Sequence, residues 1–154
     1  MRRRWPTGVA ALRGGSRHAT GRPKLTITRE VLTTYLHVQD GGKTDAIPVS
    51  ASFWEDLAKG SHPQLAQGRL MTAFTFSEPW SSWERHPAGE ELVLLIAGAA
   101  TIVLEEQEGR REVVLGRPGE FVLVPPNVWH TARPARPTTM LFLTPGAGTE
   151  HRAA

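Results

Sequence analysis

From Arg69 onward, short runs rich in β-branched and aromatic residues alternate with glycine or proline, and this alternation limits the folds open to the chain. Eight such runs follow one another between residues 69 and 144: RLMTAFTF, SSWERH, ELVLLIA, ATIVLEE, REVVLG, EFVLVP, VWHTAR and TTMLFLT. Many short strands with frequent turn signals are typical of a β-sandwich or a β-barrel. We therefore expect an all-β fold.

The segment 91–106, ELVLLIAGAATIVLEE, is long enough for a helix. Gly98, the β-branched residues 101–103 and the lack of an apolar stripe instead favour a β-hairpin. One short helix is expected ahead of the barrel, over residues 52–60. Ser52 and Glu55 there form a capping-box pattern, and Gly60 supplies a stop.

The chain has 154 residues, which suits one domain with a core of its own. The Gly, Arg and Pro content of the first residues can bury little apolar surface. We predict a disordered basic leader over residues 1–22 and a single domain over residues 23–148. The barrel should occupy about residues 69–144, and residues 149–154 should form a polar tail.

The positive charge of the chain is concentrated at its start. Residues 1–29 hold eight Arg or Lys and no acid, whereas residues 30–154 hold ten bases and fifteen acids. A domain with excess acid is a poor partner for nucleic acid, whose phosphates need clustered bases. No apolar run approaches a membrane span, and the leader lacks the long apolar core of a secretion signal. We expect a protein of the cytoplasm that binds neither nucleic acid nor membrane.

The stretch WERHPAGEE, residues 83–91, gathers the side chains that can carry chemistry. In a strand, Glu84 and His86 project from the same face, and Glu91 begins the next apolar run. A carboxylate in an apolar wall is costly unless it is paired, protonated or bound to a metal. Because the chain has no cysteine, any metal must be bound by His, Asp, Glu or backbone oxygen.

This spacing resembles the two motifs of the cupin superfamily. The first motif is Gly, five residues, HxH, three or four residues, Glu, six residues and Gly; its matches here are Glu84, His86, Glu91 and Gly98, with Glu84 in the place of the first histidine. The second is Gly, five residues, PxG, two residues, His, three residues and Asn; its matches are Gly119, Pro125, Asn127 and His130, with Pro134 in the place of the final asparagine. Asn127 replaces a glycine, which is tolerable because asparagine can adopt the left-handed backbone conformation.

The resemblance implies a small, single-domain cupin of bacterial type, with the double-stranded β-helix of a jelly-roll barrel. It implies metal ligands at His86, Glu91 and His130, with Glu84 either a fourth ligand or a general base beside the metal. Two imidazoles and one or two carboxylates suit Fe, Mn, Zn or Ni. Leu92, Leu94 and Ile96 on the outer face of their strand must be covered by the second sheet, the N-terminal segment or another subunit. A homodimer is common in such families and is expected here.

The fold leaves the chemistry open. One hypothesis is a metal-dependent enzyme on a small molecule, either an oxygenase or an isomerase or lyase. The alternatives are a non-catalytic module that binds or senses a small ligand, such as a sugar or a carboxylate, and a structural role. Aromatic side chains are expected mainly in the core, and Arg133 and Arg136 on the surface; those aromatic residues are Phe74, Phe76, Trp80, Trp83 and Trp129.

Overall fold

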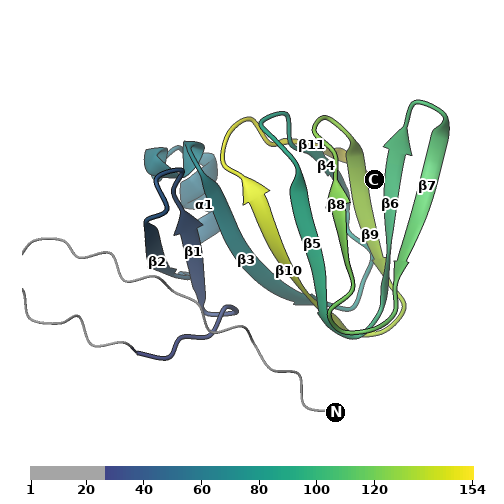
Figure 1. Cartoon of the computed structure of the whole chain (residues 1–154), viewed down its shortest axis with the longest axis horizontal. Helices are drawn as coiled ribbons and strands as arrows, with labels where there is room; N and C mark the ends of the chain where they lie inside the picture. Colours follow the sequence, from purple (N-terminus) through teal and green to yellow (C-terminus); the bar gives the residue numbers. More distant parts are fainter. Residues whose placement is uncertain (1–26) are drawn as a thin grey trace, which may run out of the picture.

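The computed structural model describes residues 27–154, which form two antiparallel β-sheets (Figure 1). One sheet has the strand order β2-β1-β3-β10-β5-β8 and the other the order β11-β4-β9-β6-β7. The strands are β1 (Thr34–Val38), β2 (Thr44–Pro48), β3 (Arg69–Phe76), β4 (Ser82–Arg85), β5 (Glu91–Ala97), β6 (Ala100–Glu106), β7 (Gly109–Leu115), β8 (Phe121–Val124), β9 (Trp129–Pro134), β10 (Thr138–Pro145) and β11 (Glu150–Ala153). The predicted leader, residues 1–22, lies outside the described residues.

The core lies between the two sheets and follows the two-residue period of their strands. Val93 and Leu95 on β5 pack in one cluster with Ile102 and Leu104 on β6, and all four are almost completely buried. Alternate residues of a strand face the same side, so this burial gives each sheet one apolar inner face. The prediction of an all-β fold is confirmed.

The predicted helix is α1 (Phe53–Ala58), and a 3-10 turn, η1 (Pro63–Ala66), follows it. Phe53 packs edge-on against Tyr35 of β1 with ring centroids 5.1 Å apart, so α1 lies against the β1 and β3 end of the barrel (Figure 1). The predicted capping box is wrong: Ser52 is the N-cap, but its hydroxyl donates to the Asp56 carboxylate at 2.7 Å instead of accepting from the backbone. Gly60, with φ of +75°, supplies the expected stop.

The predicted hairpin over residues 91–106 is wrong, although both of its strands exist. β5 pairs with β10 and β8 in one sheet, and β6 pairs with β7 and β9 in the other. The chain therefore changes sheets at Gly98, where φ is +89° and a Cβ would lie 2.5 Å from the carbonyl oxygen of Pro137. A glycine in a sequence marks a bend, but it does not tell which sheet the next strand joins.

Two strands, β2 and β11, are not predicted by the sequence pattern. β2 pairs with β1, and β11 forms from residues that were predicted to be a tail. All four residues of β11 are exposed, so no alternation of apolar and polar residues announces a strand there. The strand is defined by its pairing with β4, in which Arg152 lies opposite Trp83 and His151 opposite Glu84.

Apolar residues also occupy the outer face of β5 and β8. Leu92 pairs with Leu123 and Leu94 with Phe121, and Phe121 is 55 % exposed. The homodimer expected to cover this face stays a prediction. No helix among the described residues is long and apolar enough to cross a membrane.

Candidate metal centre

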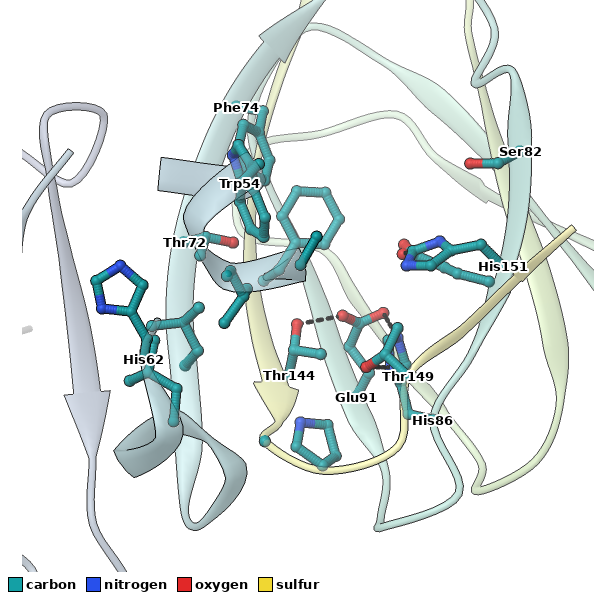
Figure 2. Close-up of a pocket in the computed structure, with 18 of the residues that line it drawn as sticks. Trp54, His62, Thr72, Phe74, Ser82, His86, Glu91, Thr144, Thr149 and His151 are labelled. Atoms are coloured by element: carbon teal, nitrogen blue, oxygen red, sulfur yellow. Dashed lines mark hydrogen bonds and ion pairs between the residues drawn. The ribbon is translucent and has the colours of Figure 1, made fainter. Parts of the chain in front are cut away.

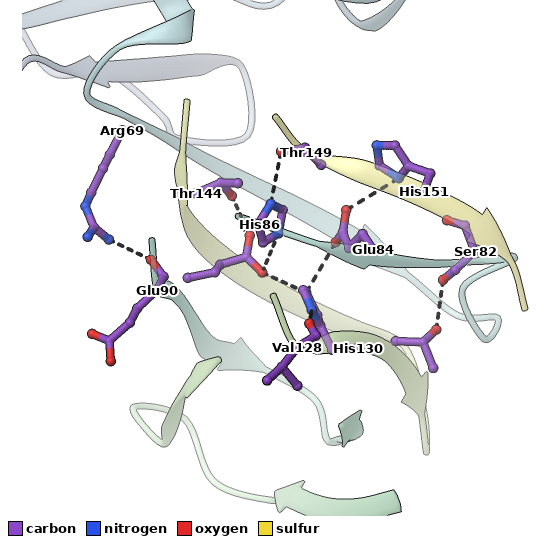
Figure 3. Close-up of polar contacts among 12 residues, drawn as sticks. Arg69, Ser82, Glu84, His86, Glu90, Val128, His130, Thr144, Thr149 and His151 are labelled. Carbon is purple, nitrogen blue, oxygen red and sulfur yellow. Dashed lines mark hydrogen bonds and ion pairs between the residues drawn. The ribbon is translucent and has the colours of Figure 1, made fainter. Parts of the chain in front are cut away.

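Four ionisable side chains meet at the mouth of the barrel (Figure 3). Glu84 belongs to β4, His86 follows that strand directly, Glu91 begins β5 and His130 is the second residue of β9. One oxygen or nitrogen atom of each lies within 4.8 Å of those of the others. β4 and β9 pair at Glu84 and His130, which explains how residues far apart in the sequence meet. The structure thus brings together all four predicted residues; metal binding itself stays a prediction.

A backbone hydrogen bond joins the two motif loops. The amide of Asn127 donates to the carbonyl oxygen of His86 at 3.2 Å. Asn127 has φ of +63° and is the one non-glycine residue with positive φ in the described part of the chain. The left-handed conformation expected for this substitution is therefore confirmed, and it lets the second motif position the first.

Glu91 is the centre of the cluster. Its Oε2 lies 2.9 Å from Nε2 of His130 and 3.3 Å from Nε2 of His86, while its Oε1 accepts a hydrogen bond of 2.5 Å from the Thr144 hydroxyl. Glu84 lies further out: its Oε1 is 3.7 Å from Nε2 of His130. Both carboxylates therefore approach the same imidazole, Glu91 closely and Glu84 at a longer distance.

The other nitrogen of each imidazole has a partner of its own. Nδ1 of His130 donates to the carbonyl oxygen of Val128 at 3.2 Å, and Nδ1 of His86 lies 3.0 Å from the hydroxyl of Thr149. Such partners fix the orientation of a histidine ring and leave Nε2 for a metal. Both Nε2 atoms are accordingly directed at Glu91.

The side chains of the cluster shift the pKa values of one another. Burial alone would raise the pKa of Glu91, but the hydrogen bond from His130 and the nearby His86 lower it to about 2. Burial alone would lower the pKa of His130, and the hydrogen bond and charge of Glu91 outweigh burial and raise it. The pKa of Glu84 is raised by burial and by the charge of Glu91. The metal-free centre therefore favours a Glu91 anion beside a protonated His130.

These shifts predict a stability maximum for chelator-treated protein. The stabilisation from Glu91 is present above pH 4.5, its ordinary pKa, and is lost as the pH falls toward about 2. The stabilisation from His130 is fully present below pH 6.5, its ordinary pKa, and is lost as the pH rises through the raised value. The unfolding temperature should therefore be highest between pH 4.5 and 6.5.

Thermal unfolding followed by circular dichroism across this pH range measures the effect. Because the pKa of Glu84 is raised, its contribution to stability is fully present below pH 4.5, its ordinary pKa, and is lost as the pH rises through the raised value, which moves the maximum toward the acidic end of this range. An unfolding temperature that stays constant or rises from pH 6.5 to about pH 8.5 would contradict the raised pKa of His130.

The donor set fits a divalent transition metal. Nε2 of His86 is buried and has no hydrogen-bond partner, because its approach to Glu91 lacks hydrogen-bond geometry. A buried polar atom without a partner is uncommon and calls for an explanation such as a bound ion. Imidazole nitrogen and carboxylate oxygen are suitable ligands for Fe, Mn, Zn or Ni.

Three residues of the site were not predicted from the sequence: Thr144, Thr149 and His151. Thr144 contacts Glu91 from β10, and Thr149 contacts His86 from the segment before β11. Nδ1 of His151 lies 3.9 Å from Oε2 of Glu84. None of the three has ligand spacing in the sequence, since each contact depends on the pairing of distant strands.

A cavity of about 970 Å³ opens above the cluster (Figure 2). Trp54, His62 and Phe74 line one side of it, and His86, Glu91 and His151 line the other. Phe74, Phe76 and Trp80, expected in the core, also face this cavity, whereas Arg133 and Arg136 do not line it. A volume of this size accommodates a small organic molecule.

The two facing β-sheets form a barrel whose mouth holds two imidazoles and two carboxylates. Residues 75–145 match the Cupin_2 family, described as a cupin domain. Residues 75–145 therefore form a cupin domain, as the two motifs predicted, and have the cupin fold. No curated protein gives a significant match.

The chain is similar to several solved structures over about half of its length. For a cupin-2 domain protein from Shewanella frigidimarina, the identity is 15%, the TM-score 0.41 and the coverage 55% of this chain and 71% of that one. For a cupin superfamily protein from Desulfitobacterium hafniense, the identity is 23% and the TM-score 0.42, and the match covers 49% of this chain and 65% of that one. For the hydroxypropylphosphonic acid epoxidase of S. wedmorenis, the identity is 13% and the TM-score 0.42, and the match covers 49% of this chain and 43% of that one. At such values the assignment rests on the cupin-domain match alone.

Proposed function

We propose that His86, Glu91 and His130 bind one divalent transition metal with Glu84 beside it, and that the protein is a metal-dependent enzyme acting on a small molecule in the cavity above them. The observation that carries the proposal is Nε2 of His86, which is buried without a hydrogen bond in a residue that lines this cavity. Bound there, a divalent metal supplies Lewis-acid polarisation of a ligand oxygen. The other tasks belong to the side chains of the protein.

Glu84 is the residue to which we assign proton transfer. Its side chain is 21% exposed, whereas those of His130 and Glu91 are 1% and 2% exposed. It lines the cavity and lies 3.9 Å from His151, whose side chain is 59% exposed. Glu84 can therefore reach a molecule in the cavity on one side and exchange a proton toward solvent through His151 on the other.

This arrangement favours an isomerase or lyase reaction, in which a carboxylate removes a proton next to a polarised carbonyl. The oxygenase is the second candidate. It is favoured by the composition of the inner set, because His86, Glu91 and His130 form the two-histidine, one-carboxylate set used by non-haem iron oxygenases. The two candidates differ in whether oxygen is consumed.

Metal analysis is the first test. Protein purified without chelator is expected to contain about one divalent transition metal per chain by elemental analysis. The metal-loaded protein is then assayed by NMR in D2O for exchange of α-hydrogens of uncharged ketones, and in an oxygen electrode for oxygen uptake. No metal, even after soaking, would contradict the centre. Bound metal without either activity would favour the non-catalytic binding module.

The variant Glu84→Gln separates the two roles of this residue. Because we assign proton transfer to Glu84, the Glu84→Gln protein should bind Co(II) with an affinity within about tenfold of the unaltered protein. It should keep the visible absorption spectrum of the Co(II) site and lose activity. Glu90→Gln is the matched control, because Glu90 is the exposed neighbour of Glu91 and lies outside the cluster. A weakened or spectrally altered Co(II) site in Glu84→Gln alone would make Glu84 a ligand.

A further inference from the structure

Aromatic side chains line part of the cavity. Trp54 of α1 lies 5.5 Å from Phe74 between ring centroids, Phe76 lies 5.8 Å from Trp80, and Trp80 lies 5.6 Å from Phe142. All five rings line the cavity. Such a surface favours flat apolar groups, which it can contact through both stacked and edge-on geometries.

No lysine or arginine side chain of residues 27–154 faces this space. Of the residues that the structure describes, those lining the cavity include neither lysine nor arginine. Arg69 donates to the backbone carbonyl of Glu90, and Arg85 pairs with Glu150 at 2.8 Å. Apart from three histidines, the ionisable groups of the lining are the carboxylates of Glu84 and Glu91.

The charge balance of the centre is unfavourable to an anion. Two carboxylates neutralise a divalent cation whether Glu84 binds the metal or stands beside it as a base. An anionic ligand would then add a net negative charge to an apolar cavity that offers no arginine or lysine among its described lining residues. Placing an unpaired charge in such surroundings is costly.

We propose that the ligand of this cavity is an uncharged molecule that carries an aromatic or similarly flat apolar group and one oxygen-bearing group. This inference rests on the proposed metal centre, to which the oxygen-bearing group is directed. The apolar group lies against Trp54, Phe74 and Trp80, and the polar end lies beside Glu84. Sugar phosphates and carboxylates are disfavoured, because both carry a charge that the lining does not balance.

Two probes of the same shape and different charge test the proposal. Isothermal titration calorimetry of the metal-loaded full chain with 2-naphthamide and with 2-naphthoate is expected to give about tenfold or tighter binding of the uncharged amide. Trp54→Ala should weaken the amide by about tenfold, because a ring contact is lost, and should leave the metal content unchanged. Glu84→His raises the net charge of the centre by one, because it removes a carboxylate. The ratio of the affinity for 2-naphthamide to that for 2-naphthoate should therefore become smaller.

The metal content of each sample separates this inference from the proposed function. Metal-loaded protein that binds the carboxylate as tightly as the amide, or binds neither probe, overturns the ligand class and leaves the metal centre standing. Protein that takes up no metal but still prefers the amide overturns the proposed function and supports the ligand class. Equal binding of the amide by Trp54→Ala and the unaltered protein overturns the assignment of the aromatic lining.

Discussion

Replacing His130 by alanine is expected to lower the affinity for a divalent transition metal by about 100-fold or more, since even losing an outer partner of a metal-binding histidine costs about 10- to 100-fold. His130 is completely buried, and its Nε2 lies 2.9 Å from Oε2 of Glu91. Its removal leaves one imidazole in the cluster, that of His86. Elemental analysis and competition with a chromophoric chelator measure the loss.

The same variant should destabilise the metal-free protein. Glu91 then remains buried without the imidazole whose hydrogen bond lowers its pKa, and breaking a buried ion pair from one side costs about 3–5 kcal/mol. Urea unfolding at neutral pH, after chelator treatment, measures this difference. The pKa of Glu91 should rise in the variant, because its strongest hydrogen-bond partner is gone.

His37→Ala is the control for loss of a buried histidine as such. His37 is 3% exposed on β1 and its Nε2 contacts the carbonyl oxygen of Gln67 at 2.8 Å, outside the cluster. This variant should lose stability while keeping the metal. If His130→Ala retained metal with unchanged affinity, the proposed centre would be wrong.

The sequence predicts three residues of the cluster, Glu84, His86 and Glu91, because their positions are set locally. Glu84, His86 and Glu91 lie within one strand, one turn and the start of the next strand, so the two-residue period of a strand directs them. His130 is far away in the sequence, and only the spacing of a second motif identifies it. The strands of the barrel were predictable for the same reason, since their apolar runs and turn residues are local signals.

The remainder of the site depends on which strands become neighbours. Thr144, Thr149 and His151 reach the cluster because β10 lies beside β5 and β11 lies beside β4. A local pattern carries no information about such pairing, as the wrong hairpin at Gly98 also illustrates. The aromatic lining likewise requires α1 to pack against β1 and β3.

Strand β11 is the clearest case, because side chains on the outer face of its sheet hold it in place. Arg152 lies between two tryptophans, with its guanidinium carbon 5.3 Å from the ring centroid of Trp83 and 4.5 Å from that of Trp129. Arg110 covers Trp83 at 4.9 Å and Arg85 covers Trp129 at 4.9 Å. These alternating rings and guanidinium groups compensate for the lack of buried side chains in β11.

Trp83→Ala is therefore expected to lower the free energy of unfolding by about 3 kcal/mol, at the lower end of the range for a buried aromatic residue. Trp83 is 7% exposed, and its ring is the surface on which Arg110 and Arg152 pack. Urea unfolding gives the magnitude. Trp54→Ala, the same substitution at a tryptophan that is 46% exposed, should cost less and serves as the control.

Trp83→Ala should also affect the metal centre, although Trp83 lies on the opposite face of the sheet. Arg152 follows His151 directly, so weakening its packing allows β11 to separate from β4 and carries His151 away from Glu84. Hydrogen exchange should become faster at residues 150–153 in Trp83→Ala, before global unfolding and without change in β5. Unchanged protection of β11 would mean that backbone pairing alone holds this strand, and the aromatic stack would then have no part in positioning His151.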